Sequence, residues 1–150
     1  MALKIYKEAT TTSAFSIEGV YDNPFSLSFN GVTGGVIETK CYLRNNSLTR
    51  WYSDISIQPI DGGEDIVDGN GTTEGFNWRL IEGDSQPTEE EWMSIVSGTA
   101  ITLSDIGSAT TGDITSFLPF WIRVEVPEGA TVACYQDVTL KISYSEGIVT

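Results

Sequence analysis

The residues best suited to chemistry are carboxylates and amides gathered in one glycine-rich segment, Asp61 to Thr73. Asp65, Asp68 and Asn70 offer oxygen ligands, and Asp68 and Asn70 are separated by a glycine, as donors are in calcium loops. The glycine and the distal glutamate do not fall in the register of an EF-hand. We therefore expect a solvated acidic loop, with a weak calcium site at Asp65, Asp68 and Asn70 as the alternative, and no cofactor.

The sequence contains no histidine, which excludes a Ser-His-Asp triad or a Cys-His nucleophile. Its two cysteines, Cys41 and Cys134, are too far apart in sequence to suggest a zinc site. No glycine-rich phosphate-binding motif is present. A glycosidase pair would have to use acids such as Glu74 and Glu82, and a chain of 150 residues has little room for a sugar cleft. We expect these two acids to be solvated, and the protein not to be an enzyme.

The charge is strongly negative, with 21 acidic and eight basic residues and a net charge of −13. Such a balance argues against binding to nucleic acid, which needs a basic surface. No apolar run approaches the roughly 20 residues that span a bilayer, so no membrane contact is expected. The first residues do not resemble a secretory signal, so we expect synthesis in a reducing cytoplasm and free thiols at Cys41 and Cys134, a disulfide being the less favoured alternative.

Tryptophan is frequent for this length and suits protein interfaces and sugar-stacking platforms alike. Strand alternation places Trp51 and Trp78 with core residues. Trp121 instead alternates with Arg123 on the face opposite the apolar residues, so Trp121 and Arg123 are the candidate interaction residues. Eleven of the acids lie between Asp54 and Glu91 with a single base. We expect docking through the Trp121 region, with this acidic segment turned to solvent.

Short alternating runs separated by Gly, Asn and Pro predict the elements that position these residues. They indicate an all-β, antiparallel, immunoglobulin-like or jelly-roll-like β-sandwich of seven to eight strands with one short helix near residues 88–96. The domain spans 1–150, with a possible extended N-terminal arm over 1–12. The runs that end the chain, either side of Pro127-Glu128-Gly129, predict a hairpin in which Ile122, Val124, Leu140 and Ile142 face inward.

The same region carries a resemblance to a known group. Val124, the turn Val126-Pro127-Glu128-Gly129 and the run Asp137 to Tyr144, DVTLKISY, resemble the small immunoglobulin-like β-sandwich proteins that tailed bacteriophages attach to their virions. The resemblance implies a non-enzymatic virion protein, made in the host cytoplasm: a capsid decoration (cement) protein or a head/tail accessory subunit. It would bind viral capsid or tail proteins and self-associate. The alternative is a carbohydrate-binding module or a phage adhesin-type domain.

Overall fold

The computed structural model describes residues 2–12, 14–15, 27–30, 32–61, 64–65, 76–129 and 138–150. These residues form eight strands and one short helix, as an all-β chain should. The strands are β1 (Leu3–Tyr6), β2 (Gly35–Asn45), β3 (Arg50–Asp61), β4 (Glu64–Asp65), β5 (Asn77–Glu82), β6 (Ile101–Thr102), β7 (Leu118–Val126) and β8 (Val138–Ile148), and the helix is α1 (Glu89–Met93).

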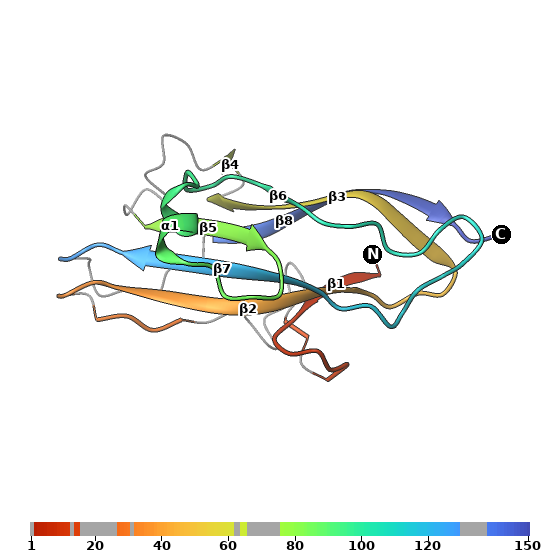
Figure 1. The fold of residues 1–150 in the computed structure, drawn as a ribbon, viewed down its shortest axis with the longest axis horizontal. Coiled ribbons are helices and arrows are strands. Elements are labelled where there is room, and N and C mark those ends of the chain that lie inside the picture. The colour runs from red at the N-terminus through yellow and green to blue at the C-terminus, as the bar shows by residue number, and fades with distance from the viewer. Residues whose placement is uncertain are drawn as a thin grey trace.

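The described strands make two antiparallel sheets that lie in two layers (Figure 1). The first sheet has the order β1-β2-β7-β5. In the second sheet β3 is central, with β8 on one side and the short strands β4 and β6 on the other. Helix α1 follows β5 on the side of the first sheet, so this sheet carries the structure's one described helix.

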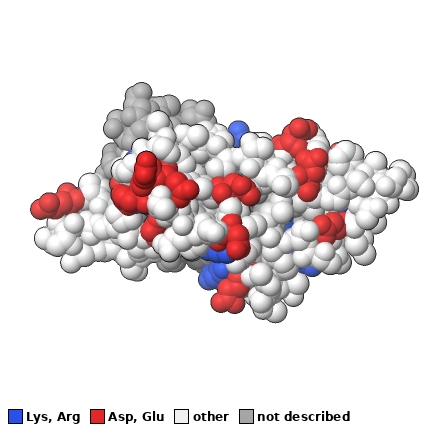
Figure 2. Space-filling view, viewed as in Figure 1, with Lys and Arg blue, Asp and Glu red and all other residues white. Residues whose placement is uncertain are grey.

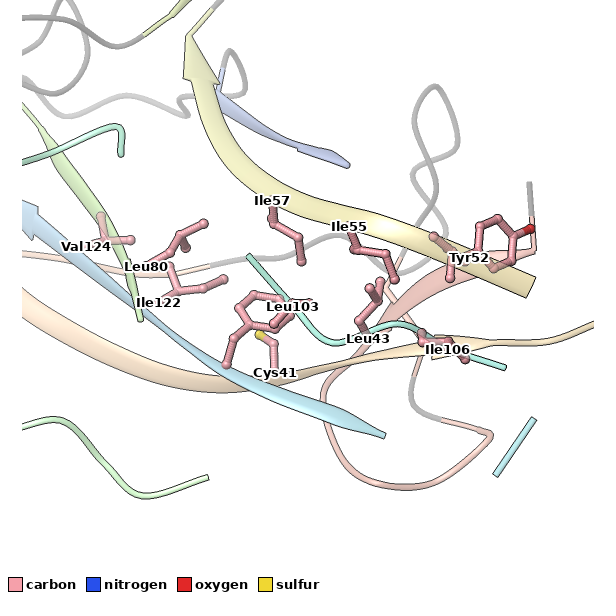
Figure 3. Close-up of a cluster of buried hydrophobic side chains, with 12 residues drawn as sticks. Cys41, Leu43, Tyr52, Ile55, Ile57, Leu80, Leu103, Ile106, Ile122 and Val124 are labelled. Atoms are coloured by element: carbon pink, nitrogen blue, oxygen red, sulfur yellow. The ribbon is translucent and has the colours of Figure 1, made fainter. Parts of the chain in front are cut away.

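The core lies between the two sheets (Figure 3). Cys41 and Leu43 of β2 and Ile122 of β7 meet Ile55 and Ile57 of β3, and all five side chains are fully buried. On each strand they are two residues apart, since alternate side chains point to the same face. Burying one such side chain contributes about 1.5–3 kcal/mol, so this cluster is a main source of stability.

The predicted hairpin at the end of the chain is wrong. β7 pairs with β2 and β5 in the first sheet, whereas β8 pairs with β3 in the second. β7 and β8 therefore belong to different layers and do not pair with each other. Alternation identifies which face of a strand is buried, but it carries no information about which strand lies beside it, and that is why the prediction failed.

The predicted inward faces of these strands are confirmed. Ile122 and Val124 are buried, and Leu140 and Ile142 are half-buried against the core. We expect Leu140→Ala to lower the free energy of unfolding by about 1–2 kcal/mol, below the range for a fully buried leucine. Lys141→Ala, on the exposed face, should change it by less than about 0.5 kcal/mol. Urea titration of both variants checks this, and equal losses would mean that the faces of β8 are misassigned.

A β-bulge in β3 overturns the predicted face of Trp51. The register with β8 shifts between Ser53 and Ser56, and Asp54 adopts a positive φ of 51°. Because the bulge adds one residue, Tyr52 before it and Ile55 after it both point into the core. Trp51 lies instead on the side of the second sheet turned away from the core. Its indole covers Gly147 so closely that a Cβ on residue 147 would overlap the ring.

Pro59 does not end the pairing of β3, contrary to what a proline near the end of an alternating run predicts. The strand continues to Asp61, and Pro59 lies opposite Leu140 of β8. On the other side of β3, β6 ends its pairing at Ile57 and β4 begins at Ile60. Pro59 thus sits where neither short strand pairs, a position at which a missing N–H costs no ladder hydrogen bond.

The start of the predicted helix is confirmed and its end is not. Thr88 caps α1 by accepting from the Glu91 amide, and the Glu91 side chain accepts from the Thr88 amide at 2.6 Å, which completes a capping box. The helix ends at Met93, and Val96 is exposed. Of Trp92, Ile95 and Val96, the apolar residues in and just after this helix, only Trp92 is fully buried.

The first residues belong to the fold instead of forming an arm. β1 pairs with β2, and Leu3 and Tyr6 are buried. A deletion of residues 1–12 would remove a strand, so the predicted arm is restricted to the exposed residues 7–12. Cys134, one of the two expected free thiols, lies outside the described residues.

Candidate functional site on the outer face of the first sheet

The outer face, defined as the side of the first sheet turned away from the core, gathers most of the basic residues. Strand register places five of the chain's eight Lys and Arg side chains here: Lys4, Lys40, Arg44, Arg79 and Arg123. They alternate along their strands with the buried residues. Figure 2 shows the contrast from another direction, with Asp and Glu in several separate groups and little Lys or Arg in view. Most of the basic side chains of this strongly acidic protein therefore lie on one face.

One end of the outer face is covered by α1. Arg123, a candidate interaction residue, is only 6% exposed there. Its two terminal nitrogens donate to the Glu89 carboxylate at 2.5 and 3.1 Å, and its Cζ lies 6.0 Å from the centre of the Trp92 ring. Arg123 thus holds the helix on the sheet. Arg123 is therefore not accessible to a partner in this structure. Strand alternation in the sequence did not indicate that a helix would cover it.

The same end forms a small ion cluster. Arg79 donates to Glu125 at 2.9 Å and to the Ile95 carbonyl at 2.9 Å. Arg123 Nε lies at ion-pair distance, 2.9 Å, from the same Glu125 oxygen, at an angle that makes no hydrogen bond. The hydrogen bond from Arg123 holds the pKa of Glu89 below its usual range, and the same contact raises the pKa of Arg123. The cluster is internally neutralised, so its role is structural.

The other end of the outer face carries Trp121, which the described residues leave half-exposed. The indole Nε1 donates to the Asp84 carbonyl at 3.3 Å, and Lys40 Nζ lies 6.0 Å from the centre of the indole ring. Lys40 also forms an ion pair with Asp84 at 2.6 Å, and this hydrogen bond raises the pKa of Lys40. Trp121 is therefore on the outer face, as predicted, and it is held in place by neighbours from β2 and the segment after β5.

Aromatic rings and cations continue from Trp121 along β2 in a row. Lys40 Nζ lies 5.3 Å from the centre of the Tyr42 ring, Tyr42 meets Phe117 edge to face at 6.2 Å, and Arg44 lies 5.3 Å from the Phe117 ring. We call Trp121, Lys40, Tyr42, Phe117 and Arg44 the aromatic–cation row. Sequence reasoning missed Lys40, Tyr42 and Arg44. The signal was present, since they alternate with the apolar residues Cys41 and Leu43 of the same strand.

Part of the acidic segment lies on the same face as Trp121, and for that part the expectation from sequence is wrong. Asp84 pairs with Lys40 and Glu89 pairs with Arg123, so acids from this segment neutralise bases on the outer face itself. The sequence predicted that the acidic residues and the docking surface would lie on different sides of the protein. They do not separate in this way, because residues 83–91 fold back over β7. What results is a face on which most charges already have partners.

The candidate calcium ligands are only partly described. Asp65 belongs to β4, which pairs with β3. The predicted acidic loop, Asp61 to Thr73, therefore contains strand residues and is not loop throughout. Asp68 and Asn70 lie outside the described residues, as does Glu74 of the proposed glycosidase pair. Elsewhere in the described ranges no three acidic or cysteine side chains gather closely enough to hold a metal. The calcium site stays a prediction.

A shallow hollow of about 520 Å³ lies between Leu48 and the segment Gly107 to Thr115. Its acid, Asp113, accepts hydrogen bonds from the Ser116 hydroxyl at 2.5 Å and from the Thr115 amide at 2.8 Å. These bonds lower the pKa of Asp113 to about 2. The Asp113 carboxylate therefore accepts hydrogen bonds from its own loop and has little remaining capacity to bind a ligand.

Cys41 is a free thiol in the core, and burial raises its pKa to about 12. A thiol held protonated in this way is a poor nucleophile. Within the described part of the chain, no helix is both long and apolar enough to cross a bilayer.

The geometry of the outer face suits binding better than reaction. Planar side chains lie beside paired charges, an arrangement that can stack against a flat partner group and hydrogen-bond around it. Comparison with family models, with curated proteins and with solved structures gave no match.

Proposed function

We propose that the chain is a non-enzymatic structural protein of a tailed-bacteriophage virion, a capsid decoration protein or a head/tail accessory subunit. Its partners are viral capsid or tail proteins, with self-association, and neither nucleic acid nor membrane. It would be made in the host cytoplasm and incorporated into the virion. The resemblance of β7 and of the run that begins β8 to phage β-sandwich proteins supports this origin.

The proposal extends to the fold. Two four-stranded antiparallel sheets with a shared core in the described residues are compatible with an immunoglobulin-like or jelly-roll-like sandwich. Such sandwiches serve as rigid binding modules in many unrelated proteins, so the fold alone does not specify the partner.

The observation that carries the proposal is the aromatic–cation row. Aromatic side chains and arginine are enriched where proteins dock, and charged groups at such sites are commonly paired. Tyr42, Phe117 and Trp121 are half-buried, so a partner would meet rings that are already held in place. Low mobility of the contact residues reduces the entropy lost on binding.

The test measures incorporation into particles. The native chain should co-purify with virions at a fixed copy number, and Tyr42→Ala and Trp121→Ala should each reduce that copy number about tenfold or more, as loss of an interface aromatic does. Leu48→Ala, exposed in a turn elsewhere, is the matched control and should incorporate normally. Thermal unfolding of each variant separates lost binding from lost folding. Absence of the native chain from particles would refute the proposal.

A carbohydrate-binding module or adhesin-type domain is the second candidate, and one observation favours it. Tyr42 and Trp121 present rings on either side of Lys40, close to the Asp84 carboxylate, and sugars bind to aromatic platforms rimmed by polar groups. In that case the isolated chain would bind a glycan and Trp121→Ala would abolish binding. Particle incorporation would then not depend on Tyr42 and Trp121.

A further inference from the structure

The outer edge of β8 is a long sheet edge that the described residues leave uncovered. At the edge formed by β1, the Phe15 amide donates to the Ile5 carbonyl at 2.8 Å. At β5, the Gly98 amide donates to the Trp78 carbonyl at 2.8 Å. The far side of β3 carries the two-residue strands β4 and β6. β8 has eleven residues and, among the described strands, pairs only with β3.

The direction of the main-chain groups on β8 follows from hydrogen bonds across the sheet. Tyr52 and Ile106 exchange both of their main-chain hydrogen bonds, at 3.0 and 2.9 Å, on the side of β3 away from β8. Neighbouring residues in a strand point their N–H and C=O groups to opposite sides, so Trp51 and Ser53 direct theirs to β8. Their partners there are Gly147 and Ser145. The odd-numbered residues of β8 therefore bond to β3, and the even-numbered residues present N–H and C=O groups to the outside.

This edge has few of the features by which proteins protect exposed strands. It is long, contains no proline, and has only Lys141 and Glu146 as charged residues. Two of its apolar side chains are also exposed, Tyr144 at 37% and Ile148 at 61%. An open edge with exposed apolar side chains is a template for another strand.

We propose that β8 pairs antiparallel with β8 of a second copy, about a two-fold axis at Ser143, so that the second sheets of two chains become one continuous sheet. Val138 then lies opposite Ile148 of the second copy, Leu140 opposite Glu146, and Ile142 opposite Tyr144. These are the even-numbered residues whose main-chain groups point outward, so each pair can exchange two hydrogen bonds. Ser143 faces its own copy in a pair without main-chain hydrogen bonds.

Symmetry and charge both select this register. A two-fold axis normal to the sheet keeps the core-facing sides of both copies on the same side of the joined sheet. Residues opposite each other in neighbouring strands point to the same face. Even-numbered residues of β8 must therefore pair with even-numbered residues of the second copy. Centring on Ser143 pairs all eleven residues and places Lys141 opposite Ser145 instead of opposite another lysine. The strand has no net charge in a chain of net charge −13, so two acidic molecules meet here with little local repulsion.

The proposal gives a geometry to the self-association included in the proposed function, but it does not require incorporation into virions and is tested on the purified chain. Sedimentation should give twice the chain mass of 16.3 kDa. Under mild oxidation Ser143→Cys should form a disulfide-linked dimer, because opposed residues in such pairs have Cα atoms about 4.5 Å apart, within the range of a disulfide. Thr139→Cys, exposed on the same face of β8, is the matched control and should not cross-link, since it lies opposite Gly147.

Charge provides a second, independent readout. Ser143→Glu and Ser143→Lys should each weaken the dimer about fivefold through repulsion between opposed like charges, and an equimolar mixture should restore it. A monomeric native chain would overturn the proposal. This holds even if the edge of β8 binds a strand of a different protein instead. A dimer that is indifferent to charge at 143 and cross-links no better through Ser143→Cys than through Thr139→Cys would overturn it as well.

Discussion

Replacing Trp92 by alanine is expected to lower the free energy of unfolding by about 3–5 kcal/mol, the range found when a buried tryptophan or phenylalanine is removed. Trp92 has no exposed surface although it belongs to a helix of only five residues. It is the side chain through which α1 packs on the first sheet, and its ring lies over the guanidinium of Arg123. Its loss leaves a cavity beside the ion pair of Arg123 and Glu89.

Met93→Ala is the matched control for Trp92→Ala. It is the next residue of the same helix and is 52% exposed, so its truncation should cost less than about 0.5 kcal/mol. Denaturant titration of both variants measures the two losses. If they were similar, α1 would not be anchored as described, and Arg123 would have to be treated again as a surface residue.

The second large effect is expected at Gly34. This residue has a positive φ of 68°, and a Cβ at this position would overlap the Val126 carbonyl oxygen and approach Glu128 N to 2.9 Å. Gly34→Ala should therefore add steric overlap with the main chain to the strain of the backbone, and lower the free energy of unfolding by about 3 kcal/mol. The atoms that it meets belong to the end of β7 and the turn that follows, which cannot move aside like a flexible side chain.

Gly129→Ala isolates the steric part of that loss. Gly129 has a similar positive φ of 79°, and a Cβ there would meet nothing within 4 Å. Its replacement should cost about 1–2 kcal/mol, the strain of a left-handed backbone alone. The difference between the two variants in denaturant titration measures the close approach of the turn before β2 to the end of β7. Equal losses would contradict that approach.

The all-β class and the buried faces of several strands could be predicted because alternation records burial directly. Cys41 and Leu43, and likewise Ile122 and Val124, alternate with polar or charged neighbours and are buried as expected. The helix start was predictable for a local reason, since Thr88 and Glu91 satisfy each other's main-chain amides without help from the rest of the chain.

Features that depend on contacts distant in sequence could not be predicted. The bulge at Asp54 changes which residues of β3 face inward, and no local pattern distinguishes it from an unbroken strand. The pairing of β8 with β3 instead of β7 involves partners about 80 to 100 residues apart.

The candidate site was predictable in part for the same reasons. Alternation placed Trp121 correctly outside the core, because that statement concerns one strand only. It could not show that α1 would cover Arg123, since this depends on where residues 83–93 pack after β5 ends. The aromatic–cation row was hidden because it is assembled from β2, β7 and residues that flank them.

The burial of Cys41 makes the lifetime of the closed structure measurable. With its pKa raised to about 12 and no exposed surface, this thiol can react with an alkylating reagent only while the two sheets are apart. At high reagent concentration every opening is captured, so the rate of labelling equals the rate of opening. Peptide mass spectrometry assigns the label to Cys41. The rate of Cys41 labelling therefore reports how often the core is exposed to water. A partner whose contact holds the two sheets together would lower that rate.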